Sequence, residues 1–306
     1  GTQAGFTFSG LKDFMASGRE LAHAELIGAL LIAGFGTLIS LFPFHSWAAP
    51  AYASAPAPVA MMHAGVLKKF GLYGLFMFQP LMETGFLPWT NILLVLLVCN
   101  VIWVGYVTVN QKRLDLLLGN SSVMHMGYIF LAFAALVVSG SAEANPWALK
   151  GAALLMLAHG LTIALLFLLC GQIEKQTGTL EINSLGGLST RLPRMAFVFG
   201  LAGMASIGLP GLANFPGEFM VFFSGFAGFS NGFGPVQIAT ILCLWGLVIG
   251  AVYMLRAYRN IFQGDLSKAS AYATGLQPSE RAANCFLVIA LAVFGFFPTL
   301  VLQFFS

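Results

Sequence analysis

The sequence predicts an all-α protein, a polytopic bundle of transmembrane helices. Of its 306 residues, 58% are hydrophobic and only 8% are charged, which leaves too little charge for a water-facing surface. The apolar residues also gather in stretches near the ~20 residues that a hydrocarbon core requires. The formal charge of +3 is scattered, without a run of like charges. We therefore expect lipid around the chain and no nucleic-acid partner.

Eight spans are expected in chain order. The residues before them, 1–20, mix glycine, serine and charge and predict a surface loop with a short interfacial helix. After the first span, residues 41–58 are rich in proline and small side chains and predict an irregular segment at the membrane edge. The spans cover about residues 22–44, 59–81, 87–109, 116–139, 148–173, 196–226, 235–258 and 283–305.

The basic residues divide unevenly between the two sides that eight spans define. One side carries Lys112, Arg113, Lys175, Arg191, Arg194, Arg256, Arg259, Lys268 and Arg281, whereas the other carries only Lys12, Arg19 and Lys150. The positive-inside rule places the first side in the cytoplasm, so both ends of the chain are expected on the non-cytoplasmic side.

The sixth span is predicted to be a broken helix. Two prolines and three glycines lie between residues 208 and 217, where they remove backbone donors and loosen the turns. Glu218 follows directly, and an ionised side chain inside an apolar span costs roughly 2.5–3.5 kcal/mol on insertion scales. A break beside a buried carboxyl indicates ion transfer. The alternative is a proline-kinked packing helix whose neutral glutamate is hydrogen-bonded to a neighbour.

Two lysines, Lys68 and Lys69, stand at the centre of the second span. Adjacent helix positions point about 100° apart, so we expect one lysine to face the bundle interior and the other to find a separate partner. A buried lysine can serve in proton transfer near neutral pH, although a lysine that snorkels to the interface or pairs statically would look the same in sequence.

Histidines stand in two further spans, His125 in the fourth and His159 in the fifth. Each histidine by itself is typical of a core histidine whose ring nitrogens are hydrogen-bonded. Together with Lys69 and Glu218, on four different spans, they form the pattern of a proton wire. Lys68 and His63 are secondary members of this candidate pathway.

The sequence holds no pattern for a metal, nucleotide or nucleophilic site. Its four cysteines, Cys99, Cys170, Cys243 and Cys285, lie in apolar runs without paired spacing. Neither a phosphate-binding glycine loop nor a nucleophile elbow occurs. The chain starts at Gly1 without an initiator methionine or signal peptide, which indicates a fragment or a processed form.

Several motifs in fixed order carry a resemblance to a known family. They are PFHSWAAPAYASAPAPVAMMHAGVLKKFGLYGL at 43–75, NSSVMHMGY, MLAHGLTIALLFLLCGQIEKQTGT, LPGLANFPGEF and YMLRAYRNIFQG at 253–264. Together they resemble the antiporter-like subunits of respiratory complex I. The resemblance implies fourteen helices in two inverted five-helix repeats, of which this chain would be the last eight. Residues 1–82 would then end the first repeat, 87–264 form the second, and 279–306 the final helix.

The resemblance also assigns roles by position. Lys69 matches the family's mid-membrane lysine of the eighth helix, His125 and His159 match polar stations of the tenth and eleventh, and Glu218 matches the terminal ionisable group of the broken twelfth. Glutamate at that last position marks the M-like (chain 4 type) subunit. The lysine of the seventh helix is replaced by Leu38, and the family's fifth-helix glutamate has no counterpart in this sequence. The first half-channel is therefore in question, whereas the second is complete.

The resemblance implies a proton-translocating membrane subunit of an NADH-quinone oxidoreductase in a bacterial inner membrane. NADH, FMN, iron–sulfur clusters and quinone would be held by partner subunits, and none by this chain. Its partners would be other membrane subunits, above all neighbouring antiporter-like ones. The alternatives are a homologous subunit of a membrane-bound hydrogenase, formate complex or multisubunit cation/proton antiporter, and a structural subunit that has lost transport, which Leu38 favours.

Overall fold

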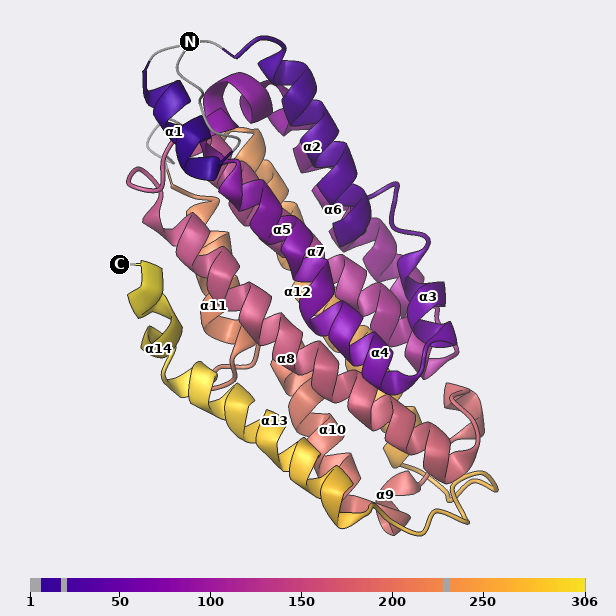
Figure 1. The fold of residues 1–306 in the computed structure, drawn as a ribbon. Coiled ribbons are helices and arrows are strands. Elements are labelled where there is room, and N and C mark those ends of the chain that lie inside the picture. The colour runs from indigo at the N-terminus through magenta and orange to yellow at the C-terminus, as the bar shows by residue number, and fades with distance from the viewer. Residues whose placement is uncertain (1–6, 18–20, 228–231, 306) are drawn as a thin grey trace.

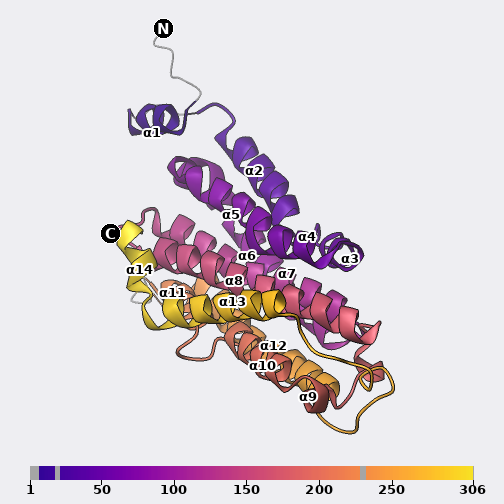
Figure 2. The same ribbon diagram turned by 60° about the horizontal axis from the view of Figure 1, so that its bottom comes forward.

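The computed structural model describes residues 7–17, 21–227 and 232–305, and these form helices joined by turns, with no strand among them. The long helices lie side by side along one direction (Figures 1 and 2). Five are long and apolar enough to cross a membrane: α6 (Thr90–Val109) with the turns before it, α7 (Leu114–Ser139), α8 (Pro146–Thr177), α12 (Pro235–Phe262) and α13 (Pro278–Phe296). The predicted helical membrane bundle is confirmed.

The other three expected spans are less regular. The first holds the single helix α2 (Ala24–Ile39), and α3 (Ala48–Ser54) follows it in the segment 41–58. The second consists of α4 (Ala57–Met62), the π-turn η1 (His63–Leu67) and α5 (Lys68–Met77), and the sixth of α10 (Pro193–Ser206) and α11 (Asn214–Ser224). Interrupted backbone at membrane depth needs protein or water beside it, so the irregular parts of these spans are the places to search for polar chemistry.

The break predicted in the sixth span is confirmed, but it is shorter than expected. Gly208 and Gly211 adopt φ values of 80° and 92°, a left-handed conformation that glycine tolerates best. Pro216 and Gly217 were expected inside the break and instead lie in the first turn of α11. The first amides of a helix have no intrahelical acceptor, so the missing donor of Pro216 interrupts nothing there.

The segment 41–58 was expected to be irregular, and that prediction is wrong for its middle. Helix α3 occupies residues 48–54, with Ala48 and Tyr52 buried. It lies so close to α7 that a Cβ atom on Gly119 would be 2.8 Å from the Cα of Ala49. Alanines pack closely, so a short helix here gains contacts that its local sequence does not reveal.

The last span is also displaced from its prediction of 283–305. Helix α13 begins at Pro278, where the Glu280 carboxylate accepts a hydrogen bond of 2.7 Å from the Gln277 amide, and ends at Phe296. Pro298 disfavours helical backbone in Phe297, and the chain continues as the short α14 (Thr299–Leu302).

Helix α7 is the centre of the bundle, with 94% of its most apolar window buried. Small residues allow its neighbours and theirs to approach closely. A Cβ atom on Gly127 of α7 would lie 3.0 Å from the carbonyl oxygen of Leu97 in α6, and one on Gly160 of α8 would lie 2.6 Å from the Gly65 carbonyl oxygen in η1. The side chains of α7 are therefore shielded from lipid by other helices.

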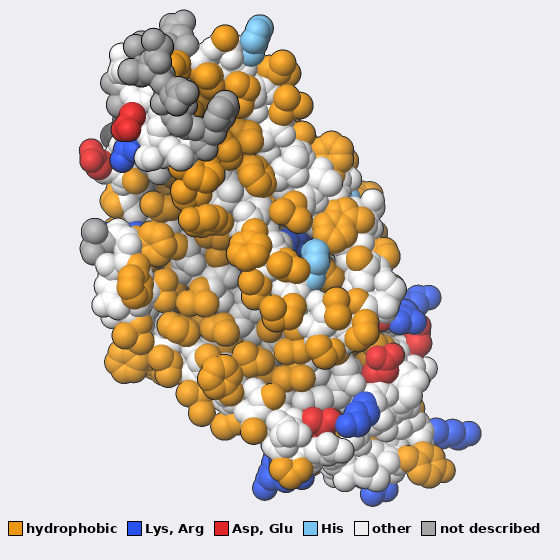
Figure 3. Space-filling model, viewed as in Figure 1, with side chains coloured by type: hydrophobic (Ala, Val, Ile, Leu, Met, Phe, Trp, Pro, Cys, Tyr) orange, Lys and Arg blue, Asp and Glu red, His pale blue; other side chains and the backbone are white. Residues whose placement is uncertain are grey.

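The surface separates an apolar band from charged ends. Hydrophobic side chains cover the middle of the visible face, and Lys and Arg gather at the end of the bundle that holds α9 (Leu188–Arg191) (Figure 3). Helix α1 (Phe8–Ala16) and the end of α13 lie toward the opposite end (Figure 1). The chain is an integral membrane protein with a basic end.

Candidate functional site

Both lysines of the second span are buried. Lys69 is 8% exposed, and its Nζ donates to the carbonyl oxygen of Ala64 in the π-turn. Lys68 is fully buried, has no hydrogen-bond partner for Nζ among the described residues, and lies 5.9 Å from the ring centroid of Tyr52. The two lysines therefore have different neighbours, the Ala64 carbonyl for Lys69 and the Tyr52 ring of α3 for Lys68, and both are buried.

His63 belongs to the same corner of the bundle. Its Nδ1 is 3.3 Å from the hydroxyl oxygen of Tyr52, and its ring packs edge-on against Trp47 with centroids 5.5 Å apart. The side chain is only partly buried. Tyr52 thus touches both secondary residues, His63 through its hydroxyl and Lys68 through its ring.

His159 lies on α8, which makes a close contact with the helix that carries the two lysines. The approach of Gly65 to Gly160 brings the lysine-bearing helix against α8 one residue from His159. The Nε2 of His159 is 3.2 Å from Ser122 Oγ, and its Nδ1 has no partner in the described structure. Its ring stacks on that of His125, with centroids 5.0 Å apart and 22° between the planes.

His125 lies between two backbone carbonyls. Its Nδ1 is 2.8 Å from the oxygen of Ser121, and its Nε2 is 2.9 Å from the oxygen of Ser206. Ser206 is the last residue of α10, so the helix break deprives its carbonyl of an intrahelical donor. A neutral imidazole has a single N–H, so only the doubly protonated ring donates to both oxygens. The negative end of the α10 dipole favours that cation.

Glu218 lies on the other side of the break, in α11, and is 3% exposed. Gly208 makes room for its carboxyl, since a Cβ atom there would overlap Oε2 of Glu218. No protein donor in the described structure reaches Oε1. This orphaned oxygen does not fit the alternative of a glutamate fixed by a neighbouring side chain.

The sequence did not single out four hydroxyl groups that complete the site. Ser121 and Ser122 precede His125 by one helical turn, and Tyr128 follows it by one turn. All three lie in the motif NSSVMHMGY, which could have indicated them. The Tyr128 ring is 5.6 Å from that of His125, and its buried hydroxyl has no partner among the described groups. Tyr253, on α12, places its hydroxyl 2.7 Å from Ser121 Oγ, a contact that only the tertiary fold creates.

The four principal predicted residues are thus all buried, and two of them touch. Among the described residues, no group of three His, Cys, Asp or Glu side chains could hold a metal ion. The ionisable groups instead lie on successive neighbouring helices, α5, α8, α7 and α11, with hydroxyls around the two histidines. Such a series suits proton transfer across the interior of a membrane protein.

Comparison with known proteins identifies the family of this chain. The family described as NADH:quinone oxidoreductase/Mrp antiporter, TM, matches residues 2–242. The chain belongs to this family. The resemblance inferred from the motifs is confirmed.

Its relatives carry consistent names. NAD(P)H-quinone oxidoreductase chain 4 1 of Synechococcus elongatus (strain ATCC 33912 / PCC 7942 / FACHB-805) is 36% identical over 299 residues, covering 96% of this chain and 53% of the relative. The protein of that name from Synechococcus sp. (strain JA-2-3B'a(2-13)) is 32% identical, with 96% and 55% covered. The chain thus spans about half the length of these relatives.

Solved structures share the fold. A chain of respiratory complex I from Thermus thermophilus with bound NADH superposes with a TM-score of 0.84 and 26% identity, over 96% of this chain and 60% of that one. The archaeal membrane-bound sulfane sulfur reductase gives 0.83 at 23% identity, over 96% and 48%. The Mrp complex of Dietzia sp. DQ12-45-1b gives 0.77 at 17%, over 97% and 64%. The last two show the fold alone.

Proposed function

We propose that the chain is the M-like, proton-conducting membrane subunit of an NADH-quinone oxidoreductase, coupled to electron transfer in other subunits. The observation that carries the proposal is the buried series Lys68 and Lys69, His159, His125 and Glu218, which passes a helix break at membrane depth. The relatives named as chain 4 of NAD(P)H-quinone oxidoreductase support the same assignment.

Each station in this series has a group that can accept or release a proton. Four buried atoms lack protein partners in the described structure: Lys68 Nζ, His159 Nδ1, Tyr128 Oη and Glu218 Oε1. Buried polar atoms of this kind are usually satisfied by internal water, which would connect the stations. The stacked histidines form the central step, because their rings are 5.0 Å apart and one of them caps α10.

The pathway crosses the helix break between His125, which contacts the end of α10, and Glu218 in α11. When His125 holds two protons, it bonds the Ser206 carbonyl at the end of α10. When it releases one to the pathway, one of its two carbonyl contacts loses its donor. Glu218, without a fixed partner on Oε1, can take up a proton and pass it to an aqueous side.

The remaining assignments follow from the family. NADH, FMN, iron–sulfur clusters and quinone are held by partner subunits, and neighbouring antiporter-like subunits contact this chain in a bacterial inner membrane. The basic end faces the cytoplasm under the positive-inside rule, with both ends of the chain on the other side. Leu38, which is 38% exposed, stands in place of the family's lysine and has no group that takes up a proton. Transfer therefore runs through the half that contains His125.

Inverted membrane vesicles that contain the complex test this function. Proton uptake and NADH oxidation are measured together, with His125→Gln as the variant and His23→Gln, an exposed histidine, as the control. We expect fewer protons per NADH with His125→Gln alone. Normal pumping in that variant would overturn the proposal. Pumping driven by hydrogen, or a sodium gradient without NADH, would favour a hydrogenase or antiporter relative, whose fold is shared.

A further inference from the structure

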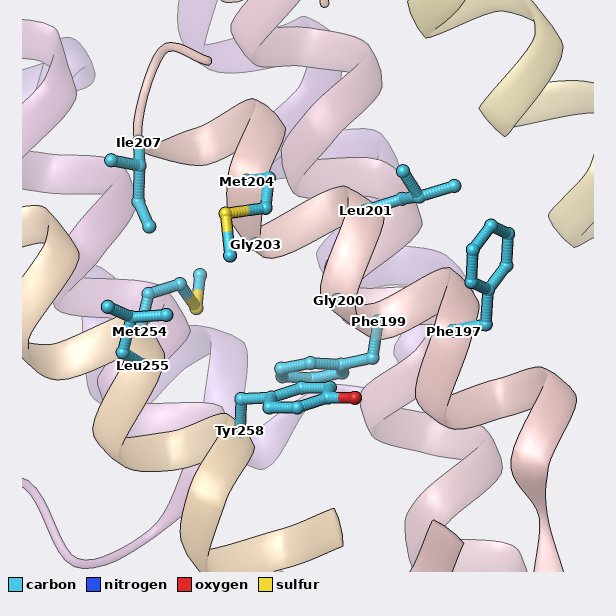
Figure 4. A pocket seen from close by; sticks show the side chains of 10 residues that line it. All are labelled: Phe197, Phe199, Gly200, Leu201, Gly203, Met204, Ile207, Met254, Leu255 and Tyr258. Carbon is cyan, nitrogen blue, oxygen red and sulfur yellow. The ribbon is translucent and has the colours of Figure 1, made fainter. Parts of the chain in front are cut away.

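A shallow apolar groove of about 260 Å³ lies between α10 and α12, and no ionisable residue of the proton series lines it. Helix α10 supplies most of its wall, and Met254, Leu255 and Tyr258 of α12 supply the other side (Figure 4). Gly200 and Gly203 have no side chains, so Tyr258 and Met254 pack directly against α10 at its floor. A Cβ atom at either would lie 3.3 Å from Tyr258 or Met254, respectively.

The groove has the length of one lipid chain. It runs from Phe197 to Ile207 along α10, ten residue steps of ~1.5 Å, or about 15 Å. That is half of the ~30 Å hydrocarbon core, the depth of a single leaflet. Ile207 follows the last residue of α10, so the groove ends where the helix break begins.

Its size selects a slender occupant. A helix with side chains is ~10–12 Å wide and rises ~5.4 Å per turn, so one turn fills roughly 420–610 Å³. A groove of about 260 Å³ cannot enclose one such turn. An acyl chain is the apolar group in a membrane that fits.

A polar pocket of about 450 Å³ lies one turn beyond the groove. Arg259 of α12 lines it and stands four residues after Leu255, on the same helix face. Asp265, in the loop that follows α12, lines the same pocket, and within the described residues neither side chain forms an ion pair with the other. A guanidinium and a carboxylate, both exposed and without an ion-pair partner in the described part of the chain, match a ligand with one negative and one positive group.

We infer that the groove and the pocket together bind one phospholipid with a zwitterionic headgroup that ends in a primary ammonium, of the phosphatidylethanolamine class. Its phosphate contacts Arg259, its ammonium donates to Asp265, and one acyl chain fills the α10–α12 groove up to Ile207. The bound chain seals the lipid side of the helix break against water. The inference is independent of the proposed proton transfer.

Photoreactive phospholipids test the site on the intact complex. The complex is placed in vesicles of equal parts ethanolamine, glycerol and choline phospholipid, with a trace of one analogue that carries a diazirine on an acyl chain. Cross-linked peptides are located by mass spectrometry. We expect the ethanolamine analogue to label residues 197–207 and 254–258 about threefold to tenfold more than the choline analogue, the ratio that one ordinary hydrogen bond gives.

Matched variants separate the two parts of the site. Leu255→Trp fills the groove and should lose most labelling, whereas Val248→Trp, on the same exposed face but outside the groove, should keep it. Arg259→Gln and Asp265→Asn should bring the ethanolamine-to-choline ratio toward one, and Lys112→Gln, also at the basic end, should not.

Three outcomes would overturn the inference. Equal labelling by all three analogues would mean bulk lipid only. Preference for the glycerol analogue would exclude the ammonium–Asp265 contact. Cross-links from the groove to a helix of another subunit, with no lipid labelling, would make the groove a protein interface.

Discussion

Gly208→Ala is the substitution that tests most directly whether the helix break positions Glu218. An added Cβ atom would overlap Glu218 Oε2, which is the far end of a flexible side chain. The carboxyl must therefore move, while the backbone around it does not have to. Displacement of a reacting group by about 1 Å can slow its step on the order of 100-fold.

The same substitution has a backbone cost that a second glycine shares. Gly208 has a φ of 80° and Gly211 a φ of 92°. An L-residue in left-handed conformation costs roughly 1–2 kcal/mol, so both Gly208→Ala and Gly211→Ala should destabilise the complex by about that amount. A Cβ atom on Gly211 meets the Phe296 ring at 3.3 Å and does not reach Glu218. Gly211→Ala is thus the matched control.

The assay combines thermal unfolding of the purified complex with protons translocated per NADH in vesicles. We expect similar losses of stability in both variants and a large loss of pumping in Gly208→Ala alone. Adding Glu218→Asp to Gly208→Ala should restore part of the pumping, because the shorter acid avoids the added methyl group. Equal loss of pumping in the two single variants would refute the reasoning.

Three further predictions concern the same bundle. Glu218→Gln should lower pumping strongly and Glu218→Asp only partly, with the complex assembled in both, since only the acid releases a proton; normal pumping in Glu218→Gln would make this a packing residue. Lys69→Ala should reduce pumping far more than Lys112→Ala, because water screens the exposed loop lysine, and equal losses would leave Lys69 a structural group. Asn100→Ala should destabilise the protein by about 1–3 kcal/mol, since its buried amide bonds three backbone groups, two in the turn after α2 and one in α7. Unfolding in denaturant measures this, with Asn110→Ala, whose amide bonds only its own helix at the surface, expected to change little.

Hydropathy was sufficient for the helical class because the bilayer imposes local rules. Backbone groups in hydrocarbon must be satisfied within the segment, so an apolar stretch of about 20 residues forms a helix whatever its neighbours are. The break near Gly208 was predictable for the same reason, since proline and glycine act on their own turns. The end of the break was not, because a proline in a first helical turn and one inside a helix look alike in sequence.

The candidate site was only partly visible before folding. Lys69, His125, His159 and Glu218 stood out because ionisable groups are rare in apolar spans. Burial was predictable from the cost of exposing them to lipid. The full burial of Lys68 was not, since the packing of α3 beside it depends on close contact with α7.

What the sequence determined by itself was therefore a set of membrane-spanning helices, one broken, and a short inventory of buried ionisable groups. The tertiary structure decided which of them meet: the stacking of His125 on His159, and the bond from His125 to the Ser206 carbonyl, 81 residues away. The physical reason is that helix formation in a membrane is a local response to the solvent. Contacts between helices depend instead on where small residues such as Gly65 and Gly160 allow two backbones to approach, and that requires both partners at once.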